Sequence, residues 1–365
     1  MSLETVEITS GDAPERGGCV TIERTQKIFE FEENVNFPSA AHFGNGAISL
    51  TFSVGRHMIN ERTVRLWSAD HGETWQPVDR AAYARCLCRL QDGRRLQVSG
   101  HEPPARKRIY PLVLRRYRDP LGEPEIETVE VELPFTLPHI HCHRSLIRLG
   151  NGELLLSAYQ REVDTARSRC FVLASADDGR TWTFRSELGG FGNETEPVLE
   201  LGRDGSVLAL VRTRGGKIEA APKGPMLQTH SRDGGRTWAP LRQTASRGVD
   251  PCALLMSNGA LVVSYGRPGI SLLVDYDGIG QTWDECLDLY LGPGCSYTSL
   301  VEVGPDRLML FYTESSFGNR GSGNTGFFPL DRMMAVYLKV ERGAAGPGSR
   351  EAQMRKSRRA QSELF

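Results

Sequence analysis

The sequence predicts an all-β fold, a six-bladed β-propeller of four-stranded antiparallel blades, and two series of repeats carry this prediction. The first series is a hairpin signal, a short turn pair between two apolar runs, and it occurs six times. The turns begin at residues 45, 92, 151, 204, 258 and 306, so that successive turns lie between 47 residues (45 to 92) and 59 residues (92 to 151) apart. A period near fifty with two hairpins per repeat is typical of propeller blades.

The second series is the box S-x-D-x-G-x-T-W, found at residues 68–75, 175–182 and 231–238, with a copy one residue longer at 275–283. An Asp two residues before a Gly predicts a tight turn, because the carboxylate accepts backbone N–H groups and Gly supplies a positive φ. The Trp then covers the hairpin with its large apolar face. We expect structural roles for the box residues Asp70, Trp75, Asp177, Trp182, Asp233, Trp238, Asp277 and Trp283.

These repeats divide the chain into blades. The first two strands of each blade flank one turn, at residues 39–52, 85–98, 145–158, 197–211, 252–265 and 299–311, and the box hairpins supply the outer strands. The sixth blade has only three strands before the pattern ends near residue 340, so the segment 20–31 is expected to close the ring as its fourth strand. The predicted organisation is a lead-in at 1–19, one propeller domain at 20–342 and a basic tail at 343–365.

Composition narrows the function classes. The chain has 365 residues, 39% hydrophobic and 24% charged, with a formal net charge of −1, which argues against a general nucleic-acid or membrane-surface partner. No apolar run has the length of a membrane span, the start lacks the features of a secretory signal, and the eight cysteines show no metal-finger spacing. We expect a cytoplasmic protein with reduced cysteines, or a secreted or periplasmic one if a signal peptide has been removed.

Propeller geometry places the starts of the inner strands and the ends of the second strands around one mouth of the central channel. The residues at these positions are polar: Asn36 to Ser39, Tyr83, Arg85, His139 to Arg144, Asn193 to Glu196, Asp250, Ser296, Tyr297, Arg56, His57, His101, Glu102, Gln160 to Glu162, Arg212, Arg267 and Glu314. A mouth rich in Arg, His, acidic residues and Tyr suits an acidic or polyhydroxylated ligand.

The boxes, the sixfold period and three local motifs together resemble the sialidase (neuraminidase) superfamily of Asp-box, or BNR-repeat, propellers. The motifs are Asn193-Glu-Thr-Glu-Pro197 ahead of Arg212, Tyr265-Gly-Arg267-Pro, and Ser296-Tyr297-Thr-Ser-Leu300. The resemblance covers residues 20–342 and implies an exo-glycoside hydrolase. The boxes themselves specify the fold more than the function, because they also occur in receptors without enzymatic activity.

By this resemblance Tyr297 would be the nucleophile, Glu196 or Glu194 its base, and Arg212 and Arg267 two clamps on a sugar carboxylate. A neutral phenol is repelled less by an anionic sugar than a carboxylate nucleophile would be, but it needs a base because its ordinary pKa is near 10. Bidentate guanidinium groups suit the substrate carboxylate. The expected ligand is an acidic sugar, with no cofactor.

The sequence departs from the family pattern at two places. Asn36 stands where an arginine usually precedes the first-blade proline, and residues 81–85 contain no aspartate to act as the acid. The third arginine could be Arg56, Arg85 or Arg144, and the acid could be Asp250 or a histidine. The alternatives are therefore a hydrolase for another acidic sugar or a carbohydrate-binding propeller without catalysis.

Three histidines, His139, His141 and His143, alternate at the start of the third blade. In a strand they would share one face, where they could contact sugar hydroxyls, move a proton or bind a metal. We assign His143 to proton transfer and His141 to substrate contact. We expect no metal, since no Cys or carboxylate lies at ligand spacing. A His/Tyr uronate lyase is the third functional alternative.

Overall fold

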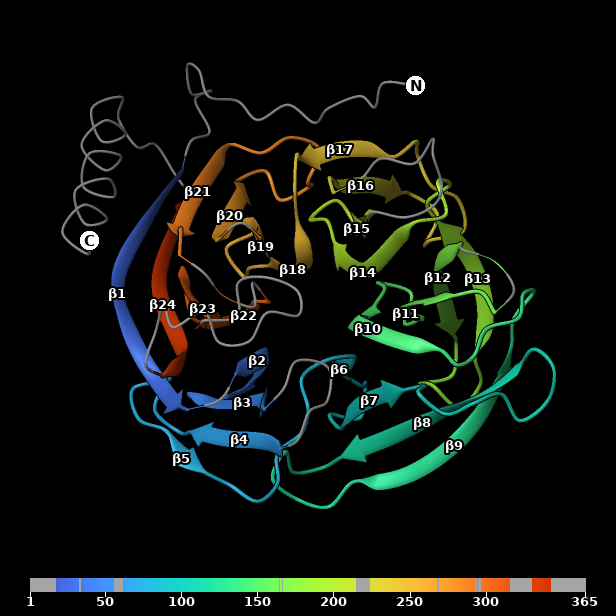
Figure 1. The fold of residues 1–365 in the computed structure, drawn as a ribbon, viewed down its shortest axis with the longest axis horizontal. Coiled ribbons are helices and arrows are strands. Elements are labelled where there is room, and N and C mark those ends of the chain that lie inside the picture. The colour runs from blue at the N-terminus through green and yellow to red at the C-terminus, as the bar shows by residue number, and fades with distance from the viewer. Residues whose placement is uncertain are drawn as a thin grey trace.

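The structure is a computed structural model, and it describes residues 18–32, 34–55, 62–163, 165, 167–214, 224–267, 269–292, 294, 297–315 and 330–342. These residues form six four-stranded antiparallel sheets arranged as a ring around a central axis (Figure 1). The predicted six-bladed propeller is confirmed. Within the described ranges, no helix has the length and hydropathy to cross a bilayer.

Each sheet runs outward from the axis in chain order, except the sixth. Blade one comprises β2 (Val35–Gly44), β3 (Ala47–Val54), β4 (Arg62–Ser68) and β5 (Gln76–Pro77). Blade two comprises β6 (Leu87–Arg89), β7 (Arg95–Ser99), β8 (Ile109–Tyr117) and β9 (Glu125–Glu132). Blade three comprises β10 (His141–Arg148), β11 (Leu154–Arg161), β12 (Ser168–Ser175) and β13 (Thr183–Leu188). Blade four comprises β14 (Glu194–Leu201), β15 (Val207–Thr213), β16 (Met226–Ser231) and β17 (Arg242–Ala245). Blade five comprises β18 (Val249–Leu255), β19 (Leu261–Gly266), β20 (Ile270–Asp275) and β21 (Glu285–Tyr290). Blade six comprises β22 (Ser299–Gly304), β23 (Arg307–Glu314), β24 (Asp331–Arg342) and β1 (Gly18–Phe31).

The first strand of the chain closes the ring. β1 pairs antiparallel with β24 from Gly18 opposite Arg342 to Phe31 opposite Asp331, so it is the outermost strand of the sixth blade. The predicted closing strand at 20–31 is confirmed. This pairing covers an edge that would otherwise present unpaired backbone groups. The lead-in up to residue 17 and the predicted basic tail lie outside the described residues.

Apolar side chains fill the spaces between neighbouring blades. One core combines Leu96 and Leu112 of blade two with Leu154 and Phe171 of blade three, all fully buried. Alternating residues on each face of a strand explain this pattern, because every blade is covered on both sides. The cores make the ring rigid and therefore fix where the inner strands present polar residues to the axis.

The Asp boxes form the turns that were predicted and also connect blades. In the third-blade box, Asp177 accepts the backbone N–H of Thr181 at 2.8 Å and its hydroxyl at 2.7 Å, and the Trp182 indole donates to Gly179 O at 3.0 Å. The Trp238 indole donates instead to Ser186 Oγ of the preceding blade at 2.9 Å. The box tryptophans thus stabilise contacts between neighbouring sheets as well as their own turns.

The longer box of blade five differs from the others. Asp275 takes the position that serine has elsewhere, and its carboxylate accepts the N–H groups of Asp277, Ile279 and Gly280 at 2.6–2.8 Å. The sequence pattern pointed to Asp277 as the turn residue of this box. The structure adds Asp275, because the extra residue in the turn offers more backbone donors than a serine hydroxyl can accept.

Candidate functional site

The inner strands carry a repeated backbone irregularity at the start of five blades. One residue in each has a positive φ between 46° and 56°, and these residues are Phe37, Cys86, Arg144, Glu196 and Asp250. The pairing register shifts at the same place in blades one, three, four and five. A residue other than Gly at positive φ is strained by about 1–3 kcal/mol, and such strain is typical of functional sites.

The bulge in blade four separates the two candidate bases. Glu194 and Glu196 would share a face in a regular strand, but the register shifts between Thr195 and Val198. The Glu194 carboxylate accepts the N–H groups of residues 190, 191 and 192 at 2.7–2.8 Å. Glu194 is therefore engaged in stabilising a loop, and Glu196 is the one of the two carboxylates that contacts Arg212 and Tyr297.

Glu196 is the centre of a buried hydrogen-bond network, with 2% exposure. Its Oε1 accepts Nη1 of Arg212 at 2.8 Å, Nη2 of Arg214 at 3.4 Å and the hydroxyl of Tyr297 at 3.4 Å. Its Oε2 accepts the backbone N–H of Asp250 at 2.9 Å. The predicted partners Tyr297, Glu196 and Arg212, from blades six and four, are thus brought together. Arg214 is a contact that the sequence motifs did not indicate.

Tyr297 is held in a defined position. Its side chain is 7% exposed, and its ring packs edge-on against Phe37 with 4.6 Å between centroids. Apolar contact with Phe37 and Val249 and the hydrogen bond to Glu196 orient the phenol. Hydrogen bonds of this length in a site without a bound ligand can shorten when a ligand binds.

A second ionic cluster surrounds Asp250, whose side chain has no exposed area. Its carboxylate contacts Nε2 of His143 at 2.9 Å, Nε and Nη2 of Arg144, the former at 2.9 Å, and Nη2 of Arg85 at 3.3 Å. Burial opposes ionisation, but Arg144, Arg85 and His143 outweigh it and hold the pKa of Asp250 well below its ordinary value.

This cluster does not favour the predicted proton donors. Asp250 is ionised and fully paired, so it has no proton to give near neutral pH. His143 is 2% exposed and has both ring nitrogens engaged, Nε2 with Asp250 and Nδ1 with Pro197 O at 3.2 Å. Arg85 and Arg144, which were alternatives for the third clamp, are both bound to the Asp250 carboxylate.

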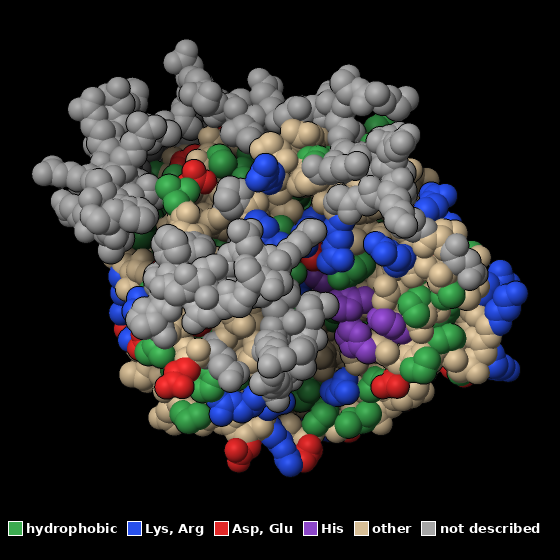
Figure 2. All heavy atoms as spheres, viewed as in Figure 1, with side chains coloured by type: hydrophobic (Ala, Val, Ile, Leu, Met, Phe, Trp, Pro, Cys, Tyr) green, Lys and Arg blue, Asp and Glu red, His purple; other side chains and the backbone are tan. Residues whose placement is uncertain are grey.

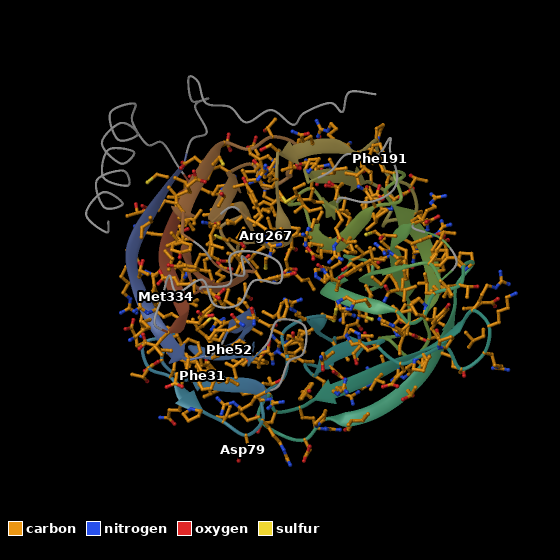
Figure 3. All side chains as sticks on the ribbon, in the orientation of Figure 1. Phe31, Phe52, Asp79, Phe191, Arg267 and Met334 are labelled. Atoms are coloured by element: carbon orange, nitrogen blue, oxygen red, sulfur yellow. The ribbon has the colours of Figure 1, made fainter. Side chains whose placement is uncertain are left out.

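The remaining predicted binding residues have varied positions. Asn36 is 1% exposed and donates to Gly55 O at 3.4 Å inside blade one, so it does not replace the missing arginine. Arg267 follows β19 and lies near the axis of the ring (Figure 3). Arg56 lies outside the described residues.

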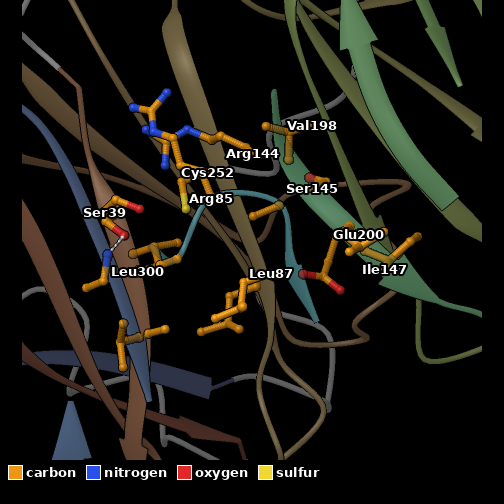
Figure 4. A pocket seen from close by; sticks show the side chains of 18 of the residues that line it. Ser39, Arg85, Leu87, Arg144, Ser145, Ile147, Val198, Glu200, Cys252 and Leu300 are labelled. Carbon is orange, nitrogen blue, oxygen red and sulfur yellow. Dashed lines mark hydrogen bonds between the residues drawn. The ribbon is translucent and has the colours of Figure 1, made fainter. Parts of the chain in front are cut away.

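The cluster also borders a cavity of about 420 Å³ in the channel, lined by the inner strands of all six blades. Arg85 and Arg144 lie at one end of this cavity and Glu200 lies apart from them (Figure 4). Burial raises the pKa of Glu200 to about 7. The Asp250 cluster therefore lies between this cavity, which Arg85 and Arg144 line, and Glu196, which accepts the backbone N–H of Asp250.

The histidine rings form a row, to which blade three contributes His141 and His143 and blade two contributes His101. His141 lies between His101 of blade two, with 4.7 Å between ring centroids, and His143, with 5.9 Å. The Tyr159 ring packs against His141 and His143 at 4.8 and 5.5 Å. Figure 2 shows histidine side chains gathered at the hollow in the centre of this face, with arginine and lysine beside them.

Positive charge predominates in the site. Four guanidinium groups (Arg85, Arg144, Arg212 and Arg214) contact two carboxylates (Glu196 and Asp250). Because all of these groups except Arg214 are largely buried, water screens the excess charge poorly. The arrangement favours an anionic ligand.

Comparison with known proteins agrees with this geometry. The family model of the BNR repeat-like domain matches residues 126–312, which is half of the chain. The chain belongs to the BNR repeat-like family. No curated protein matches it.

Solved structures extend the likeness over most of the chain. A protein of unknown function from Dyadobacter fermentans is 19% identical with a TM-score of 0.68, covering 88% of this chain and 99% of its own. The Hadza microbial sialidase Hz136 is 17% identical with a TM-score of 0.60, covering 84% of this chain and 65% of its own. The α-L-arabinofuranosidase of Fusarium graminearum is 15% identical with a TM-score of 0.61, covering 86% and 98%. The expected sialidase-type propeller is confirmed at the level of fold.

Proposed function

We propose that this BNR repeat-like protein is a retaining exo-glycoside hydrolase for an acidic sugar, with Tyr297 as nucleophile and Glu196 as its base. The observation that carries the proposal is the buried contact between the Tyr297 hydroxyl and Glu196 Oε1 at 3.4 Å, surrounded by an excess of guanidinium groups. The sialidase and the arabinofuranosidase among the structural neighbours support a glycosidase on this scaffold.

The chemistry follows from the contacts of Glu196. Its carboxylate takes the phenolic proton as the Tyr297 oxygen attacks the anomeric carbon, and the leaving-group oxygen departs with the bonding electron pair, as a phenolate or with a proton taken from water. In a second step water attacks the anomeric carbon, the Tyr297 oxygen leaves and regains the proton held by Glu196, and the proton lost by the water passes to solvent. Arg212 and Arg267 bind the carboxylate of the sugar, and Arg214, which is 45% exposed, lies at the open side of the pair.

One observation favours the second candidate, a carbohydrate-binding propeller without catalysis. Residues 81–85, where the family usually has the acid, contain no aspartate. Asp250, one of the two predicted substitutes, is enclosed by three nitrogen-bearing side chains, and His143 has both ring nitrogens engaged, so neither is suited to protonate a leaving sugar. The third candidate, a His/Tyr uronate lyase, would draw on the histidines at this position, where the Tyr159 ring packs against His141 and His143.

Aryl glycosides separate these functions, because a phenolic leaving group of low pKa departs with little help from an acid. We would assay fluorogenic α-sialosides and β-glucuronides with the wild type, Tyr297→Phe and Glu196→Gln. The matched control is Tyr117→Phe, which changes a buried tyrosine of β8.

The proposal expects turnover that falls at least about 100-fold in both site variants and is unchanged in the control. Turnover that survives Tyr297→Phe would contradict the assigned nucleophile. Binding of the sugar without turnover supports the second candidate, and an unsaturated uronate product, detected by ultraviolet absorption, supports the lyase.

A further inference from the structure

The proposed hydrolysis leaves three histidines at the channel mouth without a role. His101 follows β7 of blade two, and His139 and His141 lie at the start of β10 of blade three. One nitrogen from each ring lies within 4.8 Å of the other two. His101 and His141, the first and the last of the three, are 40 positions apart in the sequence, and the ring architecture brings them together.

We propose that His101, His139 and His141 bind a divalent transition-metal ion of the Zn²⁺ class at the mouth of the channel. Three imidazoles with further positions open are a ligand set that zinc accepts in proteins. With metal–nitrogen bonds of about 2.0–2.1 Å, tetrahedral ligand atoms lie about 3.3 Å apart, so the rings must approach one another by about 1.5 Å or less. His101 is the exposed member of the three, so its side chain is the one with most room to move.

The local hydrogen bonds present a nitrogen lone pair at this position. The Gln160 amide oxygen accepts the backbone N–H of Arg161 at 2.8 Å, so its NH₂ group faces Nε2 of His139 at 2.6 Å. Nε2 of His139 is therefore an acceptor, as a metal ligand must be. Metal binding would replace a single neutral hydrogen bond.

The chemistry of the donors selects the class of ion. Nitrogen ligands without a carboxylate suit Zn²⁺, Co²⁺, Ni²⁺ or Cu²⁺ and not Mg²⁺ or Ca²⁺, which prefer oxygen. The Tyr159 ring contacts His141 at 4.8 Å and His143 at 5.5 Å, and His143 contacts Asp250 at 2.9 Å. A metal here would be connected to the Asp250 cluster through these rings, and its open positions could accept an oxygen of the ligand. Binding of the metal does not depend on the proposed function.

Metal titration of the full chain, without an affinity tag and after treatment with a chelator, tests the proposal. Zn²⁺ is added in a calorimeter, and Co²⁺ is followed by its visible absorption. We expect one ion per chain with micromolar or tighter affinity, weakened about 100-fold in His101→Ala and in His141→Ala. The control is His42→Gln, because His42 and His71 form another pair of neighbouring histidine rings, with 6.5 Å between centroids. This variant should bind the metal as the wild type does.

The proposal is overturned if no stoichiometric binding occurs, if both alanine variants bind as the wild type does, or if the cobalt spectrum shows thiolate ligands. Far-ultraviolet circular dichroism checks that each variant is folded. Should His141→Ala fail to fold, His101→Ala decides the question alone, because this exposed side chain contributes little to the core.

Discussion

Replacing Asp250 with asparagine removes the one negative charge shared by Arg85, Arg144 and His143. The change is nearly isosteric and acts on a side chain with no exposed area, so its effect reports the charge and not a cavity. The side chain of Arg144 is 6% exposed and that of Arg85 is 15% exposed. Water therefore compensates only in part for the lost carboxylate.

Breaking a buried ion pair by removing one partner costs about 3–5 kcal/mol. Asparagine still accepts one hydrogen bond, which places the expected loss near 3 kcal/mol, or a fall in Tm of roughly 4 °C for a chain of this size. The double variant Asp250→Asn with Arg144→Gln removes both partners. It should be less unstable than the sum of the single variants by about 1–2 kcal/mol.

Denaturant unfolding followed by circular dichroism at pH 6 measures both effects, with Asp288→Asn in β21 as the control. The pKa of Asp250 is lowered in the folded state, so its contribution is complete above the pKa of the unfolded carboxyl, near 4, and is lost as the pH falls toward the folded value. The gap between wild type and Asp250→Asn should therefore shrink below about pH 4. A loss smaller than about 1 kcal/mol at pH 6 would refute the proposed charge balance.

Three further variants test other parts of the account. Glu194→Gln should cost about 1.5–3 kcal/mol, because a charged acceptor of three backbone N–H groups is lost; an unchanged unfolding midpoint would contradict its role in the loop. Glu200→Gln should be more stable than the wild type at pH 8 and equal to it at pH 4, since a pKa raised to about 7 makes ionisation above that pH unfavourable to the fold; thermal scans at both pH values decide. Trp283→Phe should lower the free energy of unfolding by about 1–3 kcal/mol, because the fully buried indole donates to Gln228 Oε1 at 3.0 Å and its loss leaves a buried acceptor without that donor. A free energy of unfolding within about 0.5 kcal/mol of wild type would contradict a stabilising contact between blades through this tryptophan.

The sequence predicted the number of blades and the closing strand because turn residues are read locally. Asn-Gly and Asp-Gly pairs form hairpins whatever surrounds them, so their spacing is preserved in the structure. The Asp boxes have the same property. For blade five the pattern was less informative, because in this longer box the carboxylate of Asp275 accepts the backbone N–H groups of the turn.

The site was predicted less completely, because it depends on bulges and on distant pairs. Alternation cannot distinguish Glu194 from Glu196, and only the register shift between Thr195 and Val198 directs one of them into the centre. Which charges face one another across the axis is also not encoded in any local motif. The pairing of Asp250 with arginines from blades two and three and the approach of His101 to the other histidines arise from the closed ring.

The central claim is that Tyr297, with Glu196 as its base, forms a covalent bond to an acidic sugar. Mass spectrometry tests it most directly, after the protein has reacted with an activated fluorinated sugar acid. The fluorine slows release of the intermediate, so that the adduct can be detected. The account predicts one added sugar on the peptide that contains Tyr297, and none in Tyr297→Phe. Turnover of aryl glycosides by the wild type with the adduct on another residue, or with no adduct while the variant remains active, would contradict it.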